Sequence, residues 1–136
     1  MLMERIHENF LKQRFMTTLG AEMVLIEEGR NRIACNVTED LEQQHGFAHA
    51  GVLASIADSA CGYAALSTMP EDAEVVSVEF KINLIRPCKA SRIVAEGRVV
   101  KTGRTLVFTE GEVTDESGSE TYATMTATMF CLRPEA

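Results

Sequence analysis

The chain has 136 residues, of which 46% are hydrophobic and 24% are charged. This composition predicts one soluble globular domain over residues 1–136, and it excludes disordered, collagen-like and disulfide-rich chains. Thirteen basic against twenty acidic residues give a formal net charge of −7, which argues against a nucleic-acid partner because such binding needs a positive surface.

The N-terminal part of the chain predicts one helix and one hairpin. Apolar residues recur at helical spacing over 4–18, so an amphipathic helix that packs on the domain is expected within residues 1–18. The apolar residues at that spacing are Ile6, Phe10, Leu11 and Phe15. Strands are predicted over 21–28 and 30–38, joined by the turn sequence Glu-Gly-Arg-Asn, and a polar, irregular stretch over 39–48 follows.

Residues 49–68 form the most apolar segment of the chain and consist mainly of small residues. They predict a buried central helix rather than a surface helix. Four further strands are expected over 74–86, 91–101, 104–114 and 120–131. Because short turns join successive strands, the sheet is expected to be antiparallel. The order of elements predicts an α+β domain in which a sheet of about six strands wraps around the central helix.

Neither the N-terminus nor the cysteines indicate export or a membrane. Charges interrupt the N-terminal residues and no run of eighteen apolar residues occurs, so neither a signal peptide nor a membrane span is expected. The widely spaced cysteines form no CxxC motif and predict reduced thiols in the core of a cytoplasmic protein. They are Cys35, Cys61, Cys88 and Cys131. Neither metal-ligand motifs nor a glycine-rich nucleotide loop occur, so no metal and no cofactor are expected.

Asp58 is the one charged residue within the predicted central helix. Helical spacing surrounds it with Gly51, Ala54, Ser55, Cys61, Gly62 and Ala65. A buried carboxylate is costly unless it is paired or used, and burial raises its pKa, which makes it a better base near neutral pH. Asp58 is therefore a candidate general base. The alternative is a structural carboxylate that a backbone amide or a hydroxyl satisfies.

The start of the same helix, at His49 and Ala50, offers free backbone N–H groups that can polarise a carbonyl or hold an oxyanion. A helix cap is the alternative role for His49. Asp58 follows His49 by nine residues. On a helix this spacing points the two residues in opposite directions and separates them by roughly 13 Å along the axis. The two can therefore act on one small group only if they come from two chains. An enzyme with this helix is expected to be a homodimer with its sites at the interface.

The stretch from Gln43 to Asp58 resembles the active-site region of hotdog-fold acyl-CoA thioesterases of the phenylacetate-degradation (PaaI-like) type. Gln43, His49 and Asp58 match the family's amide, histidine and acidic positions, although Ala50-Gly51 stands where the family has two glycines. The segments SVEFKINLIRP at 77–87 and VKTGRT at 100–105 are similar to two further family features. The resemblance implies a hotdog fold over about residues 15–133.

The resemblance also implies an activity, the hydrolysis of acyl-CoA thioesters to free acid and coenzyme A. Asp58 would be the general base or the nucleophile. The Ala50 N–H, with His49 beside it, would polarise the carbonyl of a substrate held at the Asp58 of the second chain. Gln43 would help to place the water or the carbonyl, and Ser77 would lie near the water.

Substrate binding is expected at Gly51 and at basic residues near strand ends and turns, where they could meet the phosphates of coenzyme A. These are Arg86, Lys89, Lys101 and Arg104, for which ordinary surface charge is the alternative. The homodimers are expected to pair into a dimer of dimers. A hydratase or dehydratase on the same fold, and a non-catalytic acyl-CoA-binding module, remain open as alternative functions.

Overall fold

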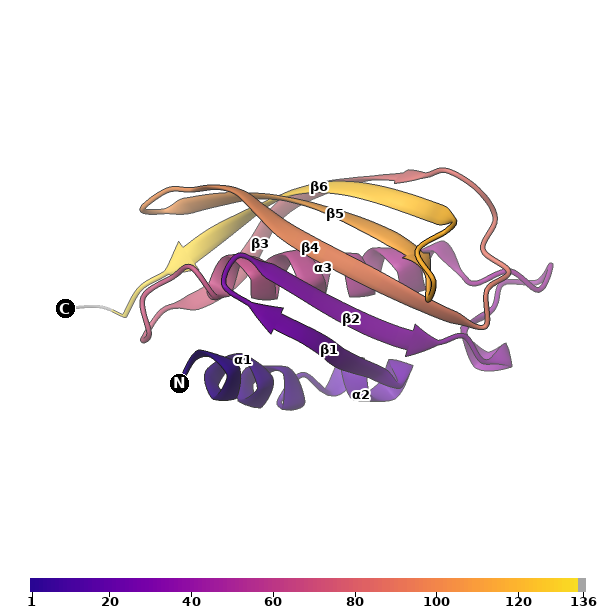
Figure 1. Ribbon diagram of the computed structural model, residues 1–136, viewed down its shortest axis with the longest axis horizontal. Helices are drawn as coiled ribbons and strands as arrows, with labels where there is room; N and C mark the ends of the chain where they lie inside the picture. Colours follow the sequence, from indigo (N-terminus) through magenta and orange to yellow (C-terminus); the bar gives the residue numbers. More distant parts are fainter. Residues whose placement is uncertain (135–136) are drawn as a thin grey trace.

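The computed structural model describes residues 1–134 (Figure 1). Its helical elements are α1 (Leu2–Leu11), α2 (Arg14–Leu19), the 3-10 turn η1 (Glu39–Leu41) and α3 (Ala50–Leu66). Its strands are β1 (Ala21–Glu27), β2 (Arg30–Asn36), β3 (Glu74–Leu84), β4 (Arg92–Thr102), β5 (Leu106–Asp115) and β6 (Thr121–Leu132). The strands and the central helix begin and end within two residues of the limits predicted from the sequence.

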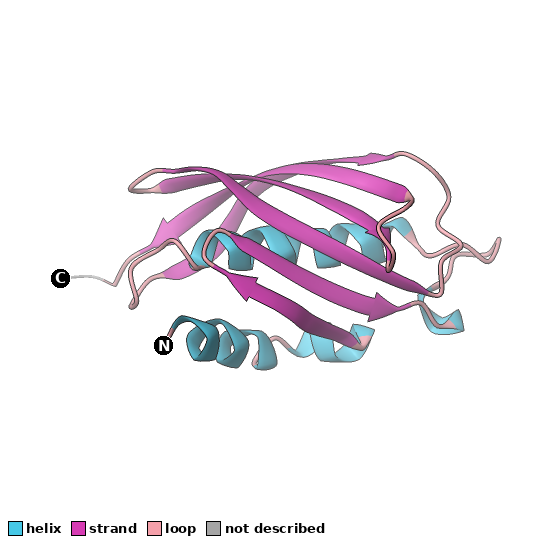
Figure 2. Cartoon of the chain, in the orientation of Figure 1, coloured by secondary structure: helices cyan, strands magenta, loops and turns pink. Residues whose placement is uncertain are grey.

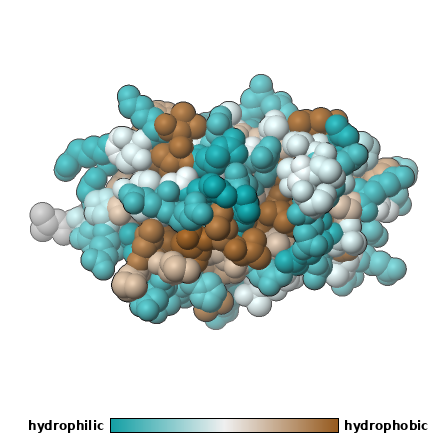
Figure 3. Space-filling model, in the orientation of Figure 1, coloured by the Kyte–Doolittle hydropathy of each residue, from teal (hydrophilic) through white to brown (hydrophobic). Residues whose placement is uncertain are grey.

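The six strands form one antiparallel sheet in the order β1-β2-β4-β5-β6-β3. The sheet curves over α3, and α1 and α2 close the side below β1 (Figure 2). Figure 3 shows a hydrophobic patch on this face of the molecule. Val24 of β1 is 47% exposed. The structure confirms the predicted α+β fold, with the sheet wrapped around a central helix.

Two glycines, Gly97 and Gly111, let α3 contact the sheet closely; they pair across β4 and β5. A Cβ atom at Gly97 would lie 2.5 Å from the carbonyl group of Ala60, and one at Gly111 would lie 2.9 Å from Sγ of Cys61. The backbone of α3 therefore rests directly on β4, and the Cys61 side chain lies against β5. This contact fixes the rotation of α3 about its axis and leaves Asp58 to point toward β3.

The prediction of a single helix over 4–18 is wrong, because Lys12 and Gln13 separate α1 from α2. Gln13 has an extended backbone, with φ −84° and ψ 92°. Its side-chain amide donates a hydrogen bond to Oη of Tyr63 and accepts one from Oγ of Ser59. These bonds to α3 span 46 and 50 residues, about a third of the chain, and local periodicity carries no information about them.

The break also changes which apolar side chains of the N-terminal segment are buried. The buried ones are Ile6, Phe10, Met16 and Leu19. Leu11 and Phe15 belong to the predicted apolar face, yet they are 62% and 53% exposed. The extended backbone of Gln13 interrupts the helical repeat, so a single helical stripe no longer describes both α1 and α2.

Candidate active site

Asp58 and Ser77 form the first half of the candidate site. Asp58 lies near the middle of α3, and its Oδ1 accepts a hydrogen bond of 2.7 Å from Oγ of Ser77 on β3. Within residues 1–134 Ser77 is the only hydrogen-bond partner of this carboxylate, so Oδ2 is free to bind a water molecule. Burial raises the pKa of Asp58 and the Ser77 hydrogen bond opposes that rise. A carboxylate with a raised pKa and a free oxygen is suited to accept a proton from water.

An open hollow of about 200 Å³ lies beside this carboxylate. Besides Asp58 and Ser77, its walls include Asn9, Gln13, Ser59, Gly62, Tyr63 and Val75. They come from the N-terminal segment, α3 and β3. The carboxylate therefore faces a space that a small group can enter.

A chain of hydrogen bonds forms one wall of this hollow. Ser59 donates to Oε1 of Gln13 at 3.2 Å, and Nε2 of Gln13 donates to the Tyr63 hydroxyl at 3.1 Å. Tyr63 donates in turn to Oδ1 of Asn9 at 3.0 Å, and Nδ2 of Asn9 donates to Glu74 at 3.3 Å. These hydrogen bonds hold the N-terminal segment against α3 beside Asp58.

Sequence reasoning did not identify Asn9, Gln13 or Tyr63 as residues near the site. The available signal is weak: the hydroxyl residues Ser59 and Tyr63 are four residues apart, which places them on one face of the predicted central helix, but nothing in the sequence links them to the amides Asn9 and Gln13.

The second half of the candidate site lies at the start of α3. His49 is the N-cap, and its Nδ1 accepts a hydrogen bond of 2.8 Å from the Gly51 N–H. Nδ1 therefore carries no proton, and in neutral His49 the proton is on Nε2, which can donate to a substrate. A Cβ at Gly51 would lie 3.0 Å from Nδ1, so glycine suits this cap. The predicted capping role is present, and it occupies the N–H of Gly51.

Gln43 and Ala50 lie together at this end. Oε1 of Gln43 accepts hydrogen bonds from the backbone N–H groups of His45 and Phe47, which leaves its amide nitrogen as a free donor. Within residues 1–134 the Ala50 N–H has no acceptor. Gln43 and Ala50 both border a hollow of about 450 Å³, which Arg86 also borders. Two donors thus border the same space at the helix start.

The two halves do not meet within one chain. Ala50 and Asp58 are eight residues apart, which is about 12 Å along a helix. They border different hollows, and His49 borders a third of about 300 Å³. The helix therefore presents its N-terminal donors and its carboxylate at separate places.

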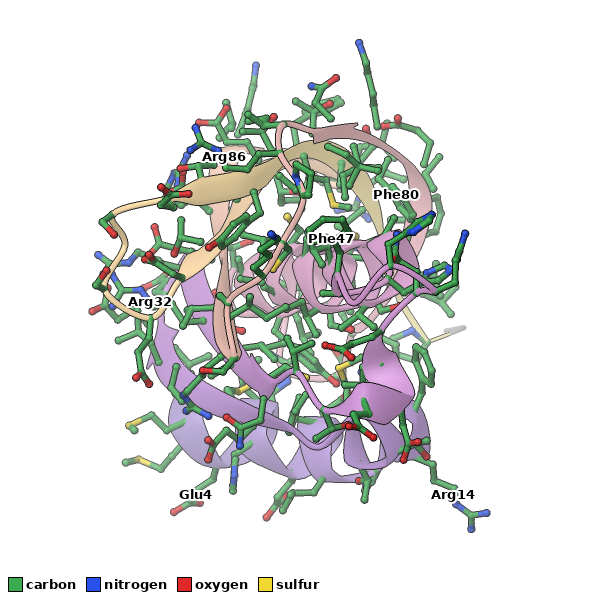
Figure 4. The ribbon with its side chains drawn as sticks, turned by 90° about the vertical axis from the view of Figure 1, so that its right-hand side faces the viewer. Glu4, Arg14, Arg32, Phe47, Phe80 and Arg86 are labelled. Carbon is green, nitrogen blue, oxygen red and sulfur yellow. The ribbon has the colours of Figure 1, made fainter. Side chains whose placement is uncertain are left out.

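The basic residues expected to bind phosphates lie at opposite ends of the sheet. Arg86 pairs with Glu120 at 3.1 Å, and Nζ of Lys89 lies 5.2 Å from the ring centre of Phe47, at the end where α3 begins (Figure 4). Lys101 and Arg104 lie at the other end, in and beside the turn that joins β4 to β5. Within residues 1–134 neither of these two side chains forms an ion pair.

The described residues 1–134 contain no group of three or more His, Cys, Asp or Glu side chains placed to hold a metal ion. Among their helices none is both long and apolar enough to cross a membrane. All four cysteines are buried and unbonded.

Comparison with known proteins places this geometry in context. A profile of the thioesterase superfamily matches residues 45–122. A thioesterase family protein from Silicibacter pomeroyi has 39% sequence identity and a TM-score of 0.95, over 98% of this chain and 100% of that one. A mutant of the phenylacetic acid degradation protein PaaI from Thermus thermophilus has 30% identity and a TM-score of 0.79, over 88% of this chain and 100% of that one.

One relative is named for its enzymatic activity. The 1,4-dihydroxy-2-naphthoyl-CoA hydrolase of Listeria monocytogenes is 28% identical over 100 residues, which cover 74% of this chain and 81% of the relative. The matched profile includes His49, Ala50, Asp58 and Ser77, and the solved relatives share the sheet that wraps around α3. The chain therefore belongs to the thioesterase superfamily and is a hotdog-fold thioesterase of the PaaI-like type.

Proposed function

We propose that this enzyme hydrolyses acyl-CoA thioesters to a free carboxylic acid and coenzyme A. The observation that carries the proposal is the Asp58 carboxylate, half-buried, raised in pKa and held by Ser77 beside an open hollow. The names of relatives support the substrate class, since one is a naphthoyl-CoA hydrolase and another is acyl-coenzyme A thioesterase 13 from Homo sapiens.

In the proposed reaction, Asp58 takes a proton from a water molecule that attacks the thioester carbonyl carbon. The oxyanion that forms is stabilised by N–H donors near the start of α3, namely the Ala50 backbone and the Gln43 amide, with His49 beside Ala50 as the helix cap. The C–S bond then breaks, and the departing thiolate of coenzyme A takes the proton from Asp58. The scheme uses only protein groups and water, with neither a metal nor a cofactor. In the alternative scheme Asp58 is the nucleophile instead of the general base.

We infer that the active unit is a homodimer, since the two halves of the site are about 12 Å apart along one helix. The edge strand β3 supports this inference. Its side chains and those that follow include five large apolar residues that are 44% to 54% exposed: Val76, Val78, Phe80, Leu84 and Ile85. A long apolar edge strand invites pairing with another chain, and a second copy of β3 offers the matching surface. Pairing of such dimers into a tetramer is the further assembly that we propose.

A two-fold axis beside β3 reverses the second chain. It would bring the β4–β5 turn of one chain, with Lys101 and Arg104, to the end where α3 of the other chain begins. Arg86 and Lys89 lie at that end. The proposed dimer thus gathers basic residues that a single chain separates, and they would meet the phosphates of coenzyme A.

The first test measures free thiol released from acyl-CoA thioesters by the wild type and by Asp58→Asn. We expect the variant to lose at least about 100-fold in turnover because it has no base. Its melting temperature should be unchanged or higher at neutral pH, where a carboxylate with a raised pKa destabilises the folded state. Equal turnover by the variant would contradict the proposal, and water addition to crotonyl-CoA without thiol release would favour a hydratase.

The second test asks whether two chains share each site. His49→Ala and Asp58→Asn are each expected to be inactive, and the two proteins are mixed, unfolded and refolded together. If the site is shared, half of the dimers are mixed and each has one intact site of two, so about a quarter of the wild-type activity returns. No recovery, in a sample that native mass spectrometry shows to contain mixed dimers, would place each site within one chain.

A further inference from the structure

Gly62 occupies an unusual place on α3. It lies four residues after Asp58, and it is buried. A Cβ atom at this position would nevertheless meet no atom within 4 Å, apart from its own stretch of helix. At Gly97, by contrast, the same atom would lie 2.5 Å from the backbone of Ala60.

Neither the backbone nor the packing of the chain explains glycine at position 62. The glycines with positive φ are Gly20, Gly29, Gly46 and Gly118, so Gly62 has no special conformation that alanine could not adopt. Glycine in the middle of a helix destabilises it relative to alanine. The space beside Gly62 is therefore left open at a cost in helix stability.

The open space belongs to the hollow beside Asp58. Its volume of about 200 Å³ is of the same order as the roughly 150 Å³ of an engineered cavity that binds benzene, so the part of the hollow beside Gly62 is the size of a compact group. Gln13 and Tyr63, joined by a hydrogen bond of 3.1 Å, also line this hollow. A group bonded to the scissile carbonyl would lie within this boundary while Asp58 acts on the carbonyl.

We propose that Gly62 is a specificity-determining residue, whose missing side chain leaves room for a short or compact acyl group beside Asp58. This inference rests on the proposed thioesterase activity. The side chain that alanine adds would occupy the space of about one methyl group of the substrate. A difference of one methylene in a pocket of this kind changes selectivity by roughly 10- to 200-fold.

The experiment compares the wild type, Gly62→Ala and the larger Gly62→Val on a series of straight-chain thioesters from acetyl-CoA to decanoyl-CoA. For Gly62→Ala we expect kcat/KM to fall at least about tenfold on the longest acyl group that the wild type accepts well, with acetyl-CoA changed less than about twofold. The preferred chain length should shorten, and further so in Gly62→Val. The melting temperature of Gly62→Ala should rise by about 3 °C.

Thr17→Ala is the matched control, because Thr17 is exposed on α2, borders none of the hollows beside the site and also gains helix propensity when replaced. It should leave the chain-length profile unchanged. An unchanged profile in Gly62→Ala, an equal loss on all acyl lengths, a lower melting temperature or a changed oligomeric state would each overturn the inference. Failure of the wild type to hydrolyse any thioester would instead overturn the proposed function.

Discussion

The two sides of α3 use small residues for opposite purposes. Toward β4 and β5, Gly97 and Gly111 accept the helix so closely that a Cβ atom on either would collide with it. Toward β3 and the N-terminal helices, Gly62 faces a hollow in which a Cβ would meet nothing. The first glycines serve packing inside the chain, whereas the third leaves space beside Asp58. The comparison shows that small size alone does not reveal which purpose a residue serves.

The same substitution should therefore have opposite effects on the two sides. Gly97→Ala places a methyl group 2.5 Å from the backbone of Ala60, and backbone atoms cannot move aside as a flexible side chain can. We expect a loss of about 2 kcal/mol in the free energy of unfolding, which is typical of an overpacked core. Chemical denaturation of Gly97→Ala and Gly62→Ala, with the wild type as reference, measures both signs in one experiment.

If Gly97→Ala were as stable as the wild type, α3 would not rest on β4 as closely as the structure shows. Folded Gly97→Ala should retain catalysis per molecule unless α3 shifts, because Gly97 does not border the hollow beside Asp58. An increase in stability for both variants would remove the distinction between the two sides.

The side of α3 that packs tightly against β4 and β5 was predicted from the sequence only in outline. The periodicity of the strands and the apolar composition of 49–68 were enough to predict a sheet around a helix. The rotation of the helix on the sheet was not predictable, because it depends on Gly97 and Gly111, which lie more than thirty residues beyond it. Asp58 stood out as a single charge in an apolar segment. The small residues around it could not be assigned to packing or to the site.

The other side of α3, here called its open side, faces the hollow beside Asp58. It was harder to predict, because much of the wall of this hollow comes from segments that are distant in the sequence. Gln13 contacts Ser59 and Tyr63, 46 and 50 residues further along the chain. The same contacts occur where α1 ends and α2 begins, which is why a continuous helix over 4–18 was the natural but wrong expectation. The family resemblance named Ser77, and the structure adds its 2.7 Å hydrogen bond to Asp58.

Ser77→Ala tests the open side with a smaller expected effect. The Ser77 hydroxyl donates to the ionised carboxylate and so opposes the rise that burial causes in the pKa of Asp58. Without it the pKa should rise further, and the acid limb of the kcat/KM profile should move to higher pH, because the base must be unprotonated. Well above that limb we expect a loss of about tenfold, from poorer placement of the carboxylate.

The matched control is Ser91→Ala, an exposed serine between Pro87 and β4 that does not border the hollow beside Asp58. Its pH profile should coincide with that of the wild type. If the acid limb of Ser77→Ala stays in place, the hydroxyl does not act on the ionisation of Asp58. If the limb moves while the plateau at higher pH is unchanged, Ser77 tunes proton affinity without positioning the base. A movement of the limb to lower pH would mean that burial does not dominate at Asp58, and the open side of α3 would then be more hydrated than its hollow of about 200 Å³ implies.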